Sequence, residues 1–290
     1  MFVFRKVVDL QQFLQSQRKL NRQIGFVPTM GALHNGHLSL IEQSRKTADL
    51  TVCSIFVNPT QFNDPADLKK YPRPIEADIR LLTNAHCDVL FLPYNREVYP
   101  KGKLTKVNMK FGKLNKVMEG QFRPGHFEGV VQVVNRLLEI VEPDYLLMGQ
   151  KDFQQFSIIA SMLEQLNSKV RLRMCPIVRE EDGLAMSSRN RRLTKEQRQK
   201  SVLISRTLKK ARKLLKTATV AEVKSFALEA LAEPEEFKPE YFEIVDGRSL
   251  QPLEKINPGK LVVACAAVWV GEIRLIDNMI CQNEQILYPE

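Results

Sequence analysis

Short apolar runs alternate with amphipathic stretches along residues 1–180, and this alternation restricts the fold more than any other feature of the chain. The apolar runs predict strands at Ile24 to Pro28, Leu50 to Val57, Val89 to Leu92, Tyr145 to Met148 and Val170 to Cys175. The stretches between them predict helices at His37 to Lys46, Ile75 to Asn84, Val130 to Val141 and Phe153 to Asn167. Repeated strand–helix–strand units build a parallel sheet that helices cover on both faces. We therefore predict an α/β fold with a doubly wound parallel sheet.

The composition changes beyond about Ile177, and a chain of 290 residues is long enough for two cores. The second part predicts a basic helix at Thr194 to Lys216, a helix at Val220 to Leu231, and strands at Tyr241 to Val245 and Leu261 to Val270. This order indicates a smaller C-terminal α+β domain. We predict domains at residues 1–177 and 178–290.

The formal net charge of +10 indicates an anionic partner, but it does not choose among nucleic acid, an anionic membrane and small anions. Basic residues are densest from Arg189 to Lys216, where apolar residues recur at helical spacing. This pattern favours a solvated helix face over a nucleic-acid patch. We predict no nucleic-acid partner.

Cysteine usage and apolar run lengths suggest a compartment. The five cysteines are scattered and never form CxxC, which argues against a disulfide framework and a zinc ribbon and fits a reducing cytoplasm. The N-terminus, MFVFRKVVDLQQFL, lacks the continuous apolar core and small-residue cleavage site of a signal peptide. The longest apolar run, Leu261 to Val270, is about half of what a spanning helix needs, so it favours a buried strand. We predict a cytoplasmic protein with no membrane partner.

Two irregular stretches that contain proline, Asn58 to Pro74 and Pro93 to Gly125, are long for simple connections. Long loops of this kind often carry function, so both are candidate substrate loops or lids.

The segment VPTMGALHNGH, Val27 to His37, passes from an apolar strand through a glycine-bearing turn into a helix. Unpaired backbone N–H groups and the positive dipole end at such a helix start favour a phosphate, and glycine permits its close approach. His34 and His37 lie three residues apart and could face the same phosphate. Donors placed there would stabilise the charge of a departing pyrophosphate.

Two other interpretations of this histidine pair are open. One histidine could cap the helix while the other packs, which is the usual role of a lone histidine. The pair could also ligate zinc, but no third ligand follows at a recognisable spacing. Because two of only four histidines form HxGH on this turn, we favour the catalytic interpretation.

A second segment, MGQKDFQQ, Met148 to Gln155, also ends a strand and begins a helix. Ligands bind at the carboxyl ends of strands in such sheets, so this segment is expected near the first. Lys151 offers a charge for phosphate oxygens. Asp152 could bind a ribose hydroxyl or cap the helix. The Gln155 amide suits a hydroxy acid, because it both donates and accepts.

Two further segments carry polar side chains. LAMSSRNRRL, Leu184 to Leu193, offers two hydroxyls and a guanidinium for polyphosphate, although one serine could instead cap a helix. SIFVNPTQF, Ser54 to Phe62, leaves a strand through Asn58 and Pro59, and its Gln61 is a candidate for binding the acid substrate.

Together with EGQFRPGHFEGV, Glu119 to Val130, these segments resemble the pantothenate synthetase (pantoate–β-alanine ligase) family in their residues and in their order along the chain. The resemblance implies a nucleotidyltransferase domain of Rossmann type with a smaller C-terminal lid domain, as a cytoplasmic homodimer. It implies Mg²⁺-ATP as cosubstrate, with no protein ligand assigned to the metal. It also implies that pantoate forms an acyl-adenylate, which β-alanine attacks to give pantothenate and AMP.

The resemblance also implies site residues. Proton donation falls to His37 and phosphate binding to His34, with Lys151 and Arg189 as further catalytic groups. Gln61 and Gln155 are implied to bind pantoate, and Gln61 also β-alanine. The implied ATP contacts are Met30, Gly31, Ala32, Leu33, His34, Asn35, Gly36, His37, Gly149, Gln150, Lys151, Asp152, Val178 (against adenine), Met186, Ser187, Ser188 and Arg189. One departure is Gln150, where the family commonly has glutamate.

Three rival functions share parts of this pattern. A phosphopantetheine-type adenylyltransferase would keep AMP on its product. A class I aminoacyl-tRNA synthetase fits the basic charge, but residues 190–290 leave little room for tRNA-reading modules. A basic nucleotide- or RNA-binding protein would show no turnover and a steep loss of affinity with salt. We favour the ligase.

Overall fold

The computed structural model describes residues 1–61, 68–69, 71–100 and 107–283. The chain forms two compact units. Unit 1 comprises Met1–Phe111, Arg123–Gly149 and Gln155–Cys175, and unit 2 comprises Gly112–Phe122, Gln150–Gln154 and Pro176–Glu290. The predicted division into functional domains at residues 1–177 and 178–290 stays a prediction.

Unit 1 contains a parallel sheet, which over the described residues has the strand order β1-β4-β3-β2-β5-β6. The strands are β1 (Phe2–Phe4), β2 (Ile24–Thr29), β3 (Leu50–Ile55), β4 (Val89–Phe91), β5 (Tyr145–Gly149) and β6 (Arg171–Cys175). The order reverses between β2 and β5, which pair directly through Gly25 and Tyr145. Ligands bind outside the carboxyl ends of strands at such a switch point. The predicted doubly wound parallel sheet is confirmed.

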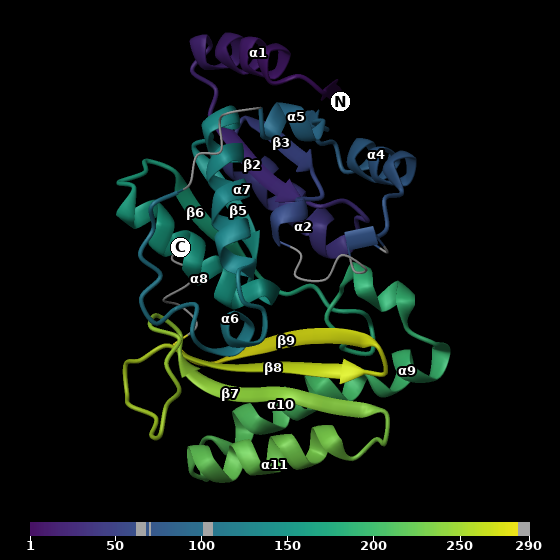
Figure 1. Cartoon of the computed structure of the whole chain (residues 1–290), viewed down its shortest axis with the longest axis vertical. Coiled ribbons are helices and arrows are strands. Elements are labelled where there is room, and N and C mark those ends of the chain that lie inside the picture. Colours follow the sequence, from purple (N-terminus) through teal and green to yellow (C-terminus); the bar gives the residue numbers. More distant parts are fainter. Residues whose placement is uncertain (62–67, 70, 101–106, 284–290) are drawn as a thin grey trace. The chain divides into compact units, whose positions relative to one another are not determined.

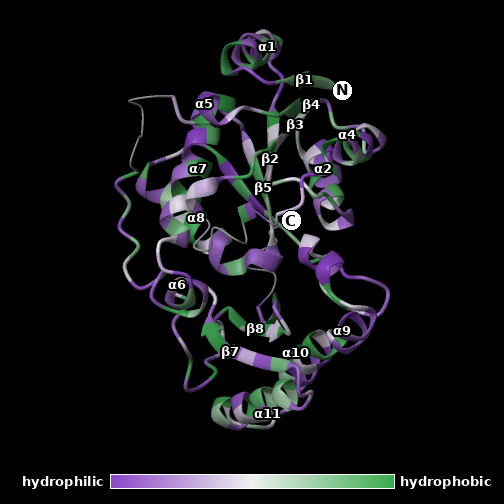
Figure 2. Cartoon of the chain, turned by 45° about the vertical axis from the view of Figure 1, so that its right-hand side comes forward, coloured by the Kyte–Doolittle hydropathy of each residue, from purple (hydrophilic) through white to green (hydrophobic). Residues whose placement is uncertain are grey.

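Helices cover both faces of this sheet. They are α1 (Val7–Lys19), α2 (Asn35–Thr47), α4 (Ile75–Asn84), α5 (Asn95–Val98), α7 (His126–Val141) and α8 (Phe153–Gln165), with the 3-10 turn η1 (Pro59–Gln61). Figure 2 shows α2 and α4 on the opposite side of the strands from α7 and α8. Leu40 and Ile41 of α2 and Leu82 of α4 share one apolar cluster with alternate strand residues such as Val27 and Cys53. Because side chains alternate along a strand, burial of both faces requires the nearly continuous apolar strands seen in the sequence.

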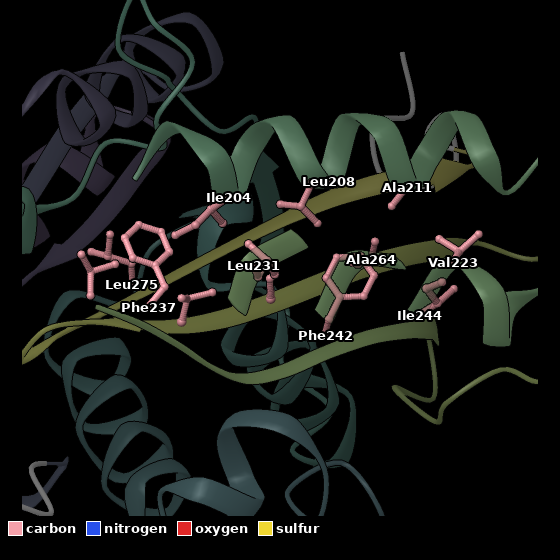
Figure 3. Packing of buried hydrophobic residues seen from close by; sticks show 14 of the residues in the cluster. Ile204, Leu208, Ala211, Val223, Leu231, Phe237, Phe242, Ile244, Ala264 and Leu275 are labelled. Carbon is pink, nitrogen blue, oxygen red and sulfur yellow. The ribbon is translucent and has the colours of Figure 1, made fainter. Parts of the chain in front are cut away.

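Unit 2 is an α+β structure, as predicted. It contains α6 (Met118–Phe122), η2 (Gln150–Asp152), η3 (Ser188–Arg192), α9 (Lys195–Lys200), α10 (Val202–Leu214) and α11 (Val220–Ala232). Its antiparallel sheet has the order β7 (Phe237–Asp246), β8 (Val262–Val270) and β9 (Ile273–Gln282). Helices α10 and α11 lie against one face of that sheet (Figure 1). Leu208, Leu231, Phe242 and Ala264 meet in the core between them (Figure 3). All of β8 except Trp269 is buried, which confirms the strand predicted from the long apolar run.

The prediction of one helix at Thr194 to Lys216 is wrong, because the chain forms two helices, α9 and α10, that meet at Ser201. The Ser201 hydroxyl is buried and donates to the carbonyl of Gln197 at 2.7 Å. A serine that bonds the preceding turn competes with regular helix bonding. No apolar residue lies between Leu193 and Val202, so hydrophobic periodicity carried no information about a break in this stretch.

The basic side chains of α10 lie on its solvent face, as predicted. Ile204, Leu208 and Ala211 are buried, whereas Arg206 and Lys213 are exposed. That this face binds no nucleic acid stays a prediction.

The sequence pattern missed β1, α1 and β9. Strand β9, IRLIDNMICQ, places Asp277 and Asn278 in the middle of its apolar positions, so it lacks the alternation expected of a strand. The two predicted substrate loops lie partly outside the described residues, at 62–67, 70 and 101–106. Within the part of the chain described, no helix is both long and apolar enough to cross a membrane.

Candidate active site

The loop that follows β2 in unit 1 is held by a buried carboxylate. Gly31 and Ala32 have left-handed backbone conformations, with φ of +83° and +51°. Asp78 of α4 is 1% exposed and accepts hydrogen bonds from the backbone N–H groups of Ala32 and Leu33, both at 2.8 Å. A side chain at position 31 would meet Asp78 at 3.0 Å, so both the conformation and the space require glycine there. Asp78 was not among the predicted site residues.

His34 and His37 together cap helix α2. The Nδ1 atom of His34 accepts from the N–H of Gly36 at 3.2 Å, and Nδ1 of His37 accepts from the N–H of His34 at 3.3 Å. The ring centroids are 4.1 Å apart. The capping interpretation therefore holds for both rings. Because each Nδ1 accepts, a neutral ring carries its proton on Nε2.

This capping changes the basis of the predicted phosphate site. The prediction relied on unpaired backbone N–H groups at the helix start. Those of Ala32, Leu33, His34 and Gly36 instead bond to side chains of the protein. An anion at this helix start would thus be bound mainly by the imidazole groups rather than by these amides.

Gln61, on η1, is brought into contact with the loop after β2. It is 9% exposed, and its Nε2 donates to Sδ of Met30 at 2.9 Å. Its backbone carbonyl lies 2.9 Å from Nδ1 of the buried His126. Asn58 bonds both the Gln61 side chain and the carbonyl of Gly129. The structure therefore unites the segments that carry Met30, Gln61 and His126.

Gly129 of α7 permits the close approach of that helix to η1. A Cβ atom at position 129 would lie 2.4 Å from the carbonyl oxygen of Thr60 and 2.8 Å from Cα of Gln61. This gives a physical reason for a glycine inside a helix, where glycine costs roughly 1 kcal/mol relative to alanine.

Gln155, at the start of α8, is partly buried and forms no hydrogen bond to Gln61 among the described residues.

The segment Gln150–Asp152 in unit 2 is anchored by β9. Nδ2 of Asn278 donates to the carbonyls of Gln150 and Lys151, at 3.0 and 2.8 Å. Oδ1 of Asn278 accepts from Nε2 of Gln150 at 3.0 Å. The Lys151 side chain keeps 20% of its surface exposed, and its Nζ lies 4.0 Å from Oδ1 of Asp152.

The segment around Met186 in unit 2 forms a short antiparallel bridge. The Met186 N–H donates to the carbonyl of Val178 at 3.0 Å, so these two predicted ATP contacts are neighbours. Ser187 caps η3 by accepting from the N–H of Arg189 at 3.3 Å, which confirms the capping interpretation for one serine. A turn at Glu181, Asp182 and Gly183 precedes this segment, with φ of +99° at Gly183.

Burial sets the thiols apart from this chemistry. The pKa of Cys87 is raised to about 12, and so is that of Cys175, mainly because burial disfavours the thiolate. Over the described residues, no three His, Cys, Asp or Glu side chains form a group that could hold a metal ion.

A Rossmann-type sheet, a glycine turn after its central strand and a helix capped by two histidines define an α/β protein with features of nucleotide-handling enzymes. Residues 2–280 match a sequence model described as pantoate-beta-alanine ligase. The chain belongs to the pantoate–β-alanine ligase family. This confirms the predicted family and the predicted class of enzyme.

Named relatives span nearly the whole chain. Pantothenate synthetase from Bacteroides thetaiotaomicron is 46% identical over 279 residues, 96% of this chain and 98% of the relative. The Porphyromonas gingivalis protein of that name is 47% identical, over 96% of this chain and 99% of its own. A crystal structure of pantothenate synthetase from Thermus thermophilus has a TM-score of 0.91 and 40% identity, covering 98% of this chain and all of that one.

A ligand-bound structure is also similar. It is the pantoate-beta-alanine ligase from Francisella tularensis complexed with beta-gamma ATP and beta-alanine. The similarity has a TM-score of 0.76 and 33% identity, and it covers 98% of each chain.

Proposed function

We propose that this chain joins pantoate to β-alanine at the expense of ATP. A carboxylate oxygen of pantoate attacks the α-phosphorus, and the bond from that phosphorus to the bridging oxygen of pyrophosphate breaks. The amine of β-alanine then attacks the acyl carbon, loses a proton and displaces AMP. The observation that carries this proposal is the family match over residues 2–280.

The first step builds negative charge on the departing pyrophosphate, so its catalysts are donors already in place. His34 and His37 fit this role, since their capping bonds direct the ring proton to Nε2. We assign phosphate binding to His34 and proton donation to His37. Loop residues Met30 to Gly36 line the ATP site in this proposal.

In unit 2, we assign phosphate binding to Lys151 and Arg189. Lysine supplies a compact charge and arginine a planar fork of donors, and both suit phosphate oxygens. Val178 would lie against the adenine, and Met186, whose N–H donates to the Val178 carbonyl, would begin the segment Met186 to Arg189 that closes over the phosphates. The remaining proposed ATP contacts are Gly149, Gln150, Asp152, Ser187 and Ser188.

Pantoate offers a carboxylate and hydroxyls, which the amides of Gln61 and Gln155 suit as donors and acceptors. Nε2 of Gln61 donates to the sulfur of Met30, a weak acceptor, so exchanging this bond for a substrate oxygen gains hydrogen-bond strength. We assign both glutamines to pantoate, and Gln61 also to β-alanine.

Magnesium belongs to this proposal as part of the substrate Mg²⁺-ATP, with the phosphates as its ligands. The +10 charge supports attraction of ATP and pantoate. The scattered cysteines, all but Cys281 of them buried, support a reducing cytoplasm as the location. We also propose a homodimer, on the strength of the family resemblance.

The test is a product analysis of the purified protein with pantoate, Mg²⁺-ATP and β-alanine. AMP, pyrophosphate and pantothenate should form in equal amounts, and only when both organic substrates are present. Pyrophosphate without AMP would indicate an adenylyltransferase instead. Nucleotide binding without turnover would indicate a basic nucleotide- or RNA-binding protein with no ligase activity.

A further inference from the structure

Two buried polar residues occupy the middle of strand β9. Asp277 is 4% exposed and Asn278 is 2% exposed, in a sheet whose other buried residues are mostly apolar. Burying a charge and an amide costs free energy unless each polar atom is paired, and apolar side chains would fill the same space at lower cost. The pairing of these two residues therefore indicates what they do for unit 2.

Asn278 uses both ends of its amide on one segment. Its Nδ2 donates to the successive carbonyls of Gln150 and Lys151, and its Oδ1 accepts from Nε2 of Gln150. Bonds to two consecutive carbonyls fix the orientations of the two peptide planes on either side of the Lys151 Cα. The base of the Lys151 side chain is thereby fixed as well.

Asp277 acts on a second segment through Arg179. The Arg179 guanidinium donates to both carboxylate oxygens, at 2.7 and 3.0 Å, and also to the carbonyl of Gly183 at 3.1 Å. The Arg179 backbone pairs with Ala185. Oδ1 of Asp277 accepts from the N–H of Asn278 at 2.8 Å, which joins the two halves of the pair.

The pair thus contacts the Lys151 segment directly and is linked through Arg179 to the loop that leads to Arg189, the other unit 2 segment to which we assign ATP phosphates. Lys151, Ala185 and Ser187 line one small cavity together with Asp277. We propose that Asp277 and Asn278 are positioning residues for ATP activation, Asn278 through Lys151 and Asp277 through Arg179 and the 183–189 loop. This inference rests on the proposed roles of Lys151 and Arg189.

The test compares Asn278→Ala and Asn278→Ser with wild type, since serine keeps a single donor. Adenylate formation is followed by pantoate-dependent exchange of pyrophosphate into ATP. The second step is followed by adding β-alanine to enzyme loaded with pantoyl adenylate. We expect Asn278→Ala to slow exchange by roughly 10- to 10²-fold and by no more than Lys151→Ala does, with serine intermediate and the β-alanine step unchanged.

A double variant separates positioning from general damage. If Asn278 acts through Lys151, the pair Asn278→Ala with Lys151→Ala should exchange no more slowly than Lys151→Ala alone. If the loss of exchange rate in the double variant is instead the product of the losses in the two single variants, the proposal is wrong. So would normal exchange by folded Asn278→Ala.

Asp246→Asn is the matched control, because Asp246 is also buried in this sheet but bonds to the turn at Arg248 and Ser249. It should lower the melting temperature without slowing exchange. If it slows exchange as much as Asn278→Ser does at equal folded fraction, the positioning role is wrong. Absence of exchange in wild type would instead refute the proposed function.

Discussion

Two loops that follow neighbouring strands are held through opposite backbone groups. After β2, the loop presents N–H groups to Asp78, an anionic acceptor. After β5, the segment at Lys151 presents carbonyls to Asn278, a neutral donor. A carboxylate only accepts and therefore suits two N–H groups, whereas two carbonyls need a donor, which the Asn278 amide supplies. The difference shows that each anchor suits the chemistry of the loop it holds.

The largest effect should come from His37, which helps to cap helix α2 and to which we assign proton donation. His37→Ala is expected to reduce adenylate formation by about 10²- to 10⁴-fold, the usual contribution of a positioned proton donor. The loss of its cap should cost only about 1 kcal/mol of stability. Pantoate-dependent pyrophosphate exchange and thermal unfolding would measure the two separately.

The control for His37 is His86→Asn, since His86 is exposed and has a φ of +55° that asparagine tolerates. Near-normal turnover by His37→Ala would remove this residue from the mechanism.

The next effect tests the anionic anchor itself. Asp78→Asn keeps the size of the side chain but sets an amide donor against one of two buried N–H groups. We expect a loss of stability on the order of 2 kcal/mol and about 10²-fold slower exchange, because the histidine loop shifts. Glu76→Gln, an exposed change on the same helix, is the control. Exchange that stays normal in folded Asp78→Asn would show that this loop holds its shape without the charge.

Lys151→Ala should have a smaller effect, because it removes a point charge but leaves its neutral anchor in place. We expect about 1.4 to 3 kcal/mol of lost transition-state stabilisation, roughly 10- to 10²-fold, all of it in the first half-reaction. Lys213→Ala removes the same charge from the solvent face of α10 and serves as the control. An effect limited to the β-alanine step would refute the phosphate role.

The last prediction concerns folding stability alone, with no expected effect on activity. It tests how much the carboxylate of Asp246 in unit 2 contributes to that stability. Burial raises the pKa of Asp246, but hydrogen bonds from Ser249, Lys260 and Arg248 outweigh it and lower this pKa from 3.8 to about 2. Since the folded pKa lies below the unfolded one, Asp246 stabilises the fold above pH 4, and this contribution disappears as the pH falls toward 2. It amounts to roughly 2 kcal/mol.

Denaturant titrations of wild type and Asp246→Asn between pH 6 and pH 2 would measure this contribution. The stability difference between the two proteins should shrink as the pH falls. A constant difference would mean that the carboxylate charge contributes nothing.

Much of the fold followed from local pattern. Strand β2 and helix α4 begin where the sequence predicted, because buried strands and amphipathic helices impose a periodicity that can be seen in a short window. The break at Ser201 and strand β9 could not be found in this way. At Ser201 the buried hydroxyl bonds to the carbonyl of Gln197 in the preceding turn, which hydrophobic periodicity does not report, whereas Asp277 and Asn278 of β9 bond to Arg179 and Lys151, 98 and 127 residues away.

The sequence by itself determined the class of sheet, the order along the chain of its strands β2 to β6 and the residue types of the candidate site. His34 and His37 were apparent because both lie in one turn of chain. Only the tertiary structure decided what holds those groups, since Asp78 lies 46 residues from Ala32, and Asn278 lies 127 residues from Lys151. Periodicity reflects which face of an element is buried, whereas a hydrogen bond between distant residues depends on where the folded chain brings them together.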